Sequence, residues 1–165
     1  MIGILPGRLA TRQRLFTGAI LVAGISLLNL IPLEFGPFGS PWPIALLWAA
    51  CGWAGLGPNL TAAGLLFILG LWIDALSGTP LGLWSSVALL TTAVTIGLSQ
   101  YLGLGSLGRL GNAGVSGIAM LVIMVIANLW RGAHFYLLGA VLPIVTAIIA
   151  YQFVGRLFEL SEDET

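Results

Sequence analysis

Residues 59–83 read NLTAAGLLFILGLWIDALSGTPLGL, an apolar run of helical length followed by a turn and the start of a second apolar run. Asn59 stands directly before the first run, where a side chain that accepts hydrogen bonds favours the start of a helix. Serine, glycine and proline within Ser77 to Gly82 favour a loop. The stretch therefore predicts two apolar helices, over 59–76 and 82–102, joined by a short connection.

The composition of the whole chain predicts an integral membrane protein. Of its 165 residues, 58% are hydrophobic and 7% are charged, whereas about 25% of the residues of a soluble domain carry charge. The formal net charge is zero, so bulk electrostatics indicates no nucleic-acid partner. We therefore expect the chain to be embedded in a lipid bilayer.

Turn signals and charged positions divide the chain into six predicted transmembrane helices of an all-α fold. The breaker Gly57-Pro58 separates the second helix from the third, and Asn112 is predicted to cap the start of the fifth. The helices are expected at 15–33, 43–56, 59–76, 82–102, 113–130 and 134–157. They form one transmembrane domain between two cytoplasmic tails, with the N-terminal tail at 1–14, the domain at 15–158 and the acidic tail at 159–165.

The helix predicted at 43–56 is short for a membrane span. At 1.5 Å per residue it is about 21 Å long, less than the roughly 30 Å of a hydrocarbon core. We expect either that Trp42 and Trp53 lie near the two membrane interfaces or that the bilayer thins around this helix.

The placement of arginine predicts the orientation in the membrane. With the N-terminus inside, only Arg131 of the six arginines lies on the outer side, and the positive-inside bias is satisfied. The arginines on the cytoplasmic side are then Arg8, Arg12, Arg14, Arg109 and Arg156. Both termini are therefore expected in the cytoplasm.

Asp74 is the one acidic residue within the continuous apolar part of the chain. A charged carboxylate at the centre of a membrane helix costs roughly 2.5–3.5 kcal/mol on insertion scales, so it needs a partner or a purpose. Asp74 falls in the last turn of its predicted helix, near the N–H groups of Ser77 and Gly78 and near the next helix start at Gly82. Capping of those donors is one interpretation. An ion site, a proton site and a partner-binding carboxylate are the alternatives.

Gly70 lies one helical turn before Asp74 and therefore on the same helix face. Small residues on such faces allow neighbouring helices to approach closely. We therefore interpret Gly70 as a packing residue and not as a ligand contact.

Residue types needed for catalysis or metal binding are scarce. Cys51 is the only cysteine and His134 the only histidine, so neither an intramolecular disulfide nor a structural zinc site can form. The chain has no nucleotide-binding loop, no nucleophile elbow and no pair of membrane-embedded carboxylates. The sequence predicts no enzyme activity and no cofactor.

The segment Gly70 to Leu83, GLWIDALSGTPLGL, resembles the signature G-L-x-x-D-x-x-S-G-x-P-x-G-x of the rod shape-determining MreD family. The preceding turn Gly57-Pro58-Asn59-Leu60 resembles the R-P-D-L turn of that family, although Gly57 and Asn59 replace its charged pair. The matched residues of the structural or partner motif are Gly70, Asp74, Ser77, Gly78, Pro80 and Gly82.

Resemblance to MreD implies a six-helix fold similar to that of the S components of energy-coupling factor transporters, without enzyme activity. It implies a multi-pass scaffold subunit of the cell-elongation complex in the bacterial inner membrane, needed for rod shape and lateral peptidoglycan synthesis. The implied partner is an MreC-like single-span periplasmic scaffold protein. Through it the subunit associates with MreB-like actin and wall-synthesis enzymes, and the resemblance is compatible with a homo-oligomer inside that larger complex.

The related fold also suggests a second hypothesis, the substrate-binding membrane subunit of a vitamin-type transporter. Such a subunit needs a polar pocket near the outer face and an ATPase module as its partner. The predicted outer side carries only Glu34, Asp74, Arg131 and His134 as ionisable groups, which are few for capturing a charged vitamin.

Overall fold

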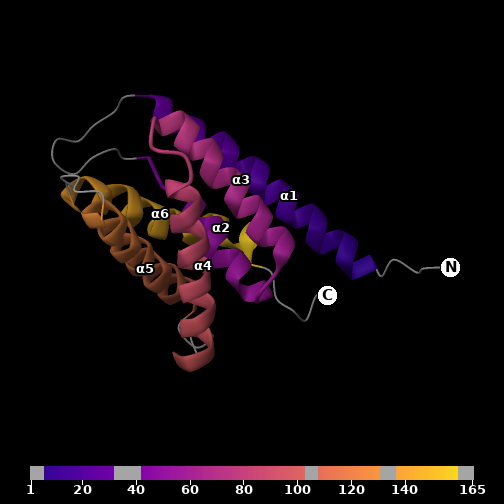
Figure 1. The fold of residues 1–165 in the computed structure, drawn as a ribbon. Coiled ribbons are helices and arrows are strands. Elements are labelled where there is room, and N and C mark those ends of the chain that lie inside the picture. Colours follow the sequence, from indigo (N-terminus) through magenta and orange to yellow (C-terminus); the bar gives the residue numbers. More distant parts are fainter. Residues whose placement is uncertain (1–5, 32–41, 103–107, 131–136, 160–165) are drawn as a thin grey trace.

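The computed structural model describes residues 6–31, 42–102, 108–130 and 137–159, which form helices and the turns between them (Figure 1). This part of the chain contains no strand, so the predicted all-α class is confirmed. The elements are α1 (Pro6–Ser26), η1 (Leu27–Leu30), α2 (Leu46–Trp53), η3 (Ala54–Leu56), α3 (Leu60–Ser77), α4 (Leu83–Leu102), α5 (Gly108–Trp130) and α6 (Leu137–Phe158).

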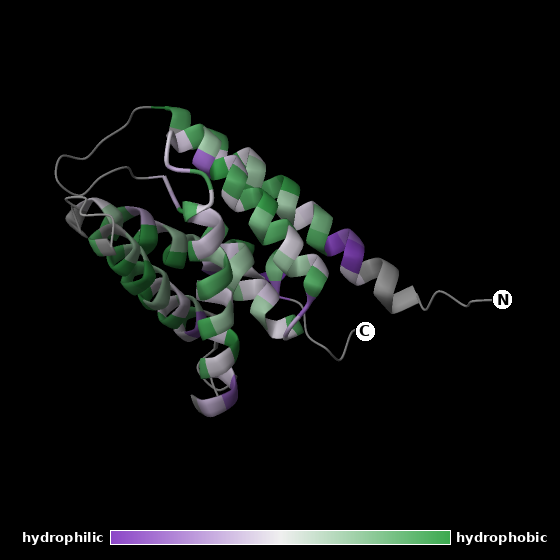
Figure 2. Cartoon of the chain, viewed as in Figure 1, coloured by the Kyte–Doolittle hydropathy of each residue, from purple (hydrophilic) through white to green (hydrophobic). Residues whose placement is uncertain are grey.

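Four of the described helices, α3 to α6, are long and apolar enough to cross a membrane. Large apolar side chains such as Ile68, Ile118 and Phe153 are exposed on these helices, and Figure 2 shows hydrophobic residues along much of their length. A soluble monomer rarely exposes apolar surface on this scale. The chain is therefore a multi-pass membrane protein, and four of the six predicted spans meet the requirement of length and composition.

Helix α1 differs from its prediction at both ends. It begins at Pro6, not at residue 15, and gives way to η1 after Ser26. Most of the tail expected at 1–14 is thus helical. Proline is favoured in the first turn of a helix and arginine is a good helix former, which explains the early start. Figure 2 shows the hydrophilic residues of α1 towards its N-terminal end, where the helix runs past the rest of the bundle.

Helix α5 begins at Gly108, so the prediction that Asn112 caps a helix starting at residue 113 is wrong. Asn112 lies inside the helix, and its Oδ1 atom is buried without a hydrogen-bond partner. Arg109 and Leu110 favour helix, and their preference outweighs the capping tendency of asparagine here.

Helix α2 forms the centre of the bundle. All eight of its residues, LLWAACGW, are buried, and it contacts each of the other five α-helices (Figure 1). A helix that is apolar on every side is expected inside a protein. The sequence of α2 therefore fits a position enclosed by the longer helices.

Trp53 packs inside the protein, which contradicts the alternative in which it anchors this short helix at a membrane interface. Its side chain is fully buried, and its ring lies 6.5 Å from the ring of Phe158, measured between centroids. A Cβ atom at Gly52 would lie 2.5 Å from the Cβ atom of Phe158, so α2 and α6 meet where α2 has no side chain. Protein covers the short helix, and its length needs neither an interfacial anchor nor a thinned bilayer.

Different helix contacts are found at the two ends of the bundle. At one end, the middle of α1 meets the end of α6, where Gly18 faces the Phe158 ring. At the other end, the Trp72 indole N–H donates to the Ser26 hydroxyl at 3.2 Å, close to the α3–α4 turn. The location of both termini in the cytoplasm stays a prediction. Glu34, Arg131, His134 and residues 160–165 lie outside the described residues.

Candidate functional site

The turn between α3 and α4 carries the matched motif, and two glycines determine its path. Gly78 has a φ angle of 63° and Gly82 has one of 93°, values that glycine adopts without steric cost. Gly78 ends α3 by donating its N–H to the backbone carbonyl oxygen of Asp74. The N–H of Thr79 donates to the same oxygen at 3.2 Å. The last turn of α3 is therefore closed by a left-handed cap.

The Asp74 side chain is fully buried and joins α3 to the start of α4. The Thr79 hydroxyl donates to Oδ1 at 2.7 Å, the Gly82 N–H donates to Oδ2 at 2.7 Å, and the Trp84 N–H donates to Oδ1 at 3.1 Å. The two N–H groups belong to the start of α4. N–H groups at a helix start have no acceptor within their own helix, and they form the positive end of the helix dipole. Asp74 thus caps the helix that follows it.

This geometry favours the capping interpretation over an ion site or a proton site. The prediction that Asp74 reaches the helix start near Gly82 is confirmed. Its predicted contact with the N–H groups of Ser77 and Gly78 is wrong in detail, because the Gly78 N–H donates to the backbone carbonyl oxygen and not to the carboxylate. Hydrogen bonds to both oxygens offset the cost of burying the charge.

Gly70 is a point of close approach between α3 and α4. A Cβ atom there would overlap the backbone of Ser85. The buried Ser85 hydroxyl donates to the carbonyl oxygen of Phe67 at 2.8 Å, which ties the two helices together beside the glycine. The interpretation of Gly70 as a packing residue is confirmed.

Part of the motif is exposed at the turn. Ser77 and Pro80 are exposed, and the side chain of Leu81 between Pro80 and Gly82 is 77% exposed. The carbonyl oxygen of Pro80 accepts the N–H of Leu83 at 3.2 Å. The turn therefore presents a small, partly apolar surface whose shape is held from within by Asp74.

At the opposite end of α3, the predicted N-cap is confirmed. Asn59 Oδ1 accepts the N–H of Thr61 at 2.9 Å and the N–H of Ala62 at 3.2 Å. Gly57, with a φ angle of 64°, turns the chain before the cap. The Asn59 side chain thus holds the start of α3, whereas backbone hydrogen bonds to the carbonyl oxygen of Asp74 close its end.

Sequence reasoning missed two residues that complete the site, Thr79 and Ser85. A threonine next to a helix end often forms a local capping hydrogen bond, so the role of Thr79 could be predicted from the sequence. Ser85 has no such signal, because its bond to Phe67 depends on how α3 and α4 cross.

Comparison of the chain with protein-family models, with curated proteins and with solved structures finds no match. The case for its function rests on its own sequence and geometry.

Proposed function

We propose that this protein is a non-catalytic scaffold subunit of the MreD type in the inner membrane of a rod-shaped bacterium. It docks an MreC-like single-span partner and so connects the wall-synthesis machinery to the membrane. With both termini in the cytoplasm, the α3–α4 turn lies on the periplasmic side, where such a partner carries its scaffold domain. The match of residues 70–83 to the family signature supports this proposal.

The observation that supports the docking role is the exposed side chain of Leu81, on a turn whose shape is fixed by the buried Asp74. The side chain of Leu81 is 77% exposed, while the carboxylate of Asp74 accepts hydrogen bonds on both sides of Leu81, from the Thr79 hydroxyl and from the backbone N–H of Gly82. A preorganised surface loses little conformational freedom on binding, which favours recognition by a partner.

The proposal is tested by affinity purification of the tagged protein from native membranes in mild detergent, followed by mass spectrometry. The expected result is recovery of a single-span periplasmic protein together with wall-synthesis enzymes. Recovery of a transporter ATPase pair would contradict the proposal and favour the vitamin-type transporter subunit.

Two exposed leucines at opposite ends of α3 give a matched pair of variants. Leu81→Glu places a charge on the turn, whereas Leu60→Glu places the same charge at the start of α3, where the side chain is 89% exposed. Neither change disturbs the core. We expect Leu81→Glu to lose the partner and Leu60→Glu to retain it, and equal recovery with both variants would exclude the turn as the docking surface.

A further inference from the structure

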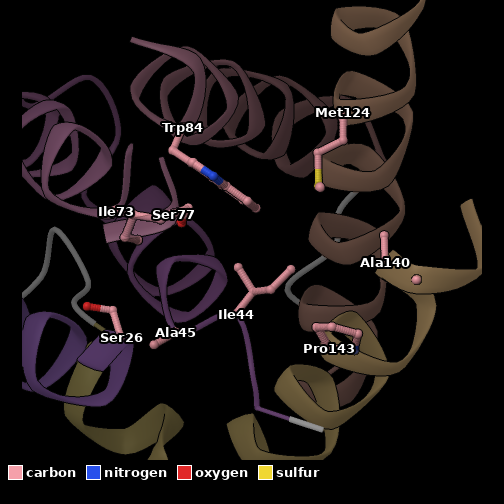
Figure 3. Close-up of a pocket in the computed structure, with 10 residues that line it drawn as sticks. Ser26, Ile44, Ala45, Ile73, Ser77, Trp84, Met124, Ala140 and Pro143 are labelled. Atoms are coloured by element: carbon pink, nitrogen blue, oxygen red, sulfur yellow. The ribbon is translucent and has the colours of Figure 1, made fainter. Parts of the chain in front are cut away.

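A cavity of about 270 Å³ lies between the helices at the end of the bundle that carries the α3–α4 turn. It is partly open, and its walls come from α1, α3, α4, α5, α6 and the residues just before α2. Figure 3 shows the side chains of Ile44, Trp84 and Met124 pointing toward a common space. All five long helices thus contribute to one partly open cavity.

The walls of this cavity are mostly apolar. Among the described residues that line it, no side chain is charged, and Ser26 and Ser77 supply the hydroxyl groups. The Ser26 hydroxyl is already engaged, because it donates to the carbonyl oxygen of Ala23 at 2.7 Å and accepts from the Trp72 indole. On the described walls, a group that enters the cavity finds no charge to pair with, so an apolar and uncharged occupant is favoured.

Two apolar occupants can be compared, a hydrocarbon chain and a helix. About 10–15 Å³ is enough for one water-sized group, so a cavity of 270 Å³ has room for several methylene groups of an acyl chain. A partner helix is about 10 Å across and would have to separate lining helices that already contact one another, such as α3 and α4 or α5 and α6. The cavity therefore fits a flexible chain better than a partner helix.

Gly139 marks an unfilled part of the wall. It lines the cavity, and a Cβ atom built on it would meet no other atom within 4 Å. Protein interiors are normally packed without voids of this kind. Because four of the surrounding helices are suited to cross a membrane, the hydrocarbon nearest to this opening is that of the lipids.

We propose that this cavity binds the hydrocarbon chain of a membrane lipid, which enters from the leaflet on the side of the α3–α4 turn. This inference goes beyond the proposed function and does not depend on it. The bound chain packs against Trp84, whose backbone N–H is held by Asp74 at 3.1 Å. Trp84 therefore contacts both the cavity and the carboxylate that shapes the turn.

The test uses the purified protein without partners in nanodiscs of phosphatidylethanolamine and phosphatidylglycerol. One arm contains phosphatidylethanolamine with a photoactivatable diazirine at the end of an acyl chain, and a second arm contains a free fatty acid with the same group. After irradiation, mass spectrometry maps the labelled residues. We expect label on cavity residues such as Met124 and Trp84. Label from the phosphatidylethanolamine probe would identify the bound chain as part of a phospholipid, and label from the fatty-acid probe would identify it as a free acid.

Two glycine variants make the test specific. Gly139→Leu fills the cavity, while Gly114→Leu adds the same side chain at a helical glycine that also meets nothing within 4 Å but does not line the cavity. The cavity label should be lost in the first variant and kept in the second. Should Gly139→Leu not fold, Gly139→Ala replaces it, with a smaller loss of label expected.

Label confined to outward residues such as Ile118 and Ile126 in the unmodified protein would overturn the proposal. Cavity label that persists in a folded Gly139→Leu protein would overturn it as well. Because no partner is present in the nanodiscs, these results are independent of whether Leu81 binds an MreC-like protein.

Discussion

The Asp74 Oδ2 atom accepts the backbone N–H of Gly82 at 2.7 Å, across a turn in which Gly82 itself has a φ angle of 93°. The carboxylate thereby links the end of α3 to the start of α4, while its Oδ1 atom accepts from Thr79 and Trp84. A charge placed in this way stabilises a defined loop shape and is shielded from the membrane.

Replacement of Asp74 by asparagine should destabilise the protein. The amide keeps the shape of the side chain but replaces one acceptor oxygen with a donor, so at least one of the three donors around it loses its partner. The expected loss is about 1–3 kcal/mol in the free energy of unfolding. It is measured by thermal or denaturant unfolding in detergent, with the wild type alongside.

Thr79→Val is the companion variant for this prediction, because it removes only the hydroxyl that donates to Oδ1. Since the two residues touch, the effect of the double variant should differ from the sum of the single effects. An unchanged stability of Asp74→Asn, or strict additivity with Thr79→Val, would show that the carboxylate does not hold the turn.

Gly70→Ala should weaken the contact between α3 and α4, because its Cβ atom would overlap the backbone of Ser85. Forcing an extra carbon into such a contact costs about 1–3 kcal/mol. Gly64→Ala on the same helix is the control, since a Cβ atom there meets nothing within 4 Å, and it should be neutral or gain up to about 1 kcal/mol from helix propensity. The two melting temperatures are compared, and an equal response would refute the close approach at Gly70.

The features that sequence predicted correctly are those with local causes. The cap at Asn59 and the connection between α3 and α4 depend on residues a few positions apart, so residue type and spacing were sufficient. The same holds for Asp74, whose carboxylate reaches the helix start ten residues or fewer along the chain.

The features that sequence reasoning missed depend on how helices pack. Residues 46–53 are apolar on every side, a pattern that a helix enclosed by protein shares with a helix that faces lipid. Trp53 is buried, although tryptophan is also common at membrane interfaces. The early start of α1 was missed for another reason. Its arginines were read as the end of a membrane segment, although arginine is equally compatible with a helix that continues beyond the bundle.

Two buried tryptophans of α2 should respond differently to the same substitution. The Trp48 indole N–H donates to the carbonyl oxygen of Ala147 at 2.8 Å, whereas the Trp53 indole nitrogen is buried without a hydrogen-bond partner. Trp48→Phe removes a bond, and Trp53→Phe removes an unpaired donor whose burial is itself unfavourable. Both variants lose similar packing volume, so Trp48→Phe should be the less stable by about 1 kcal/mol. Unfolding of both in the same detergent measures the difference, and the reverse order would contradict these hydrogen-bond assignments.

Gly78 offers a test of the backbone conformation at the end of α3. Its φ angle of 63° lies in the left-handed region, where an L-residue with a Cβ atom is disfavoured by roughly 1–2 kcal/mol. Space is not the obstacle, because a Cβ atom at this position would meet no atom within 4 Å. Gly78→Ala should therefore lower the stability by about 1 kcal/mol through backbone strain alone. Asparagine tolerates the left-handed region better than alanine, so Gly78→Asn should be the milder change although its side chain is larger. Equal losses in the two variants, or a larger loss with asparagine, would mean that side-chain size and not the φ angle determines the residue at this turn.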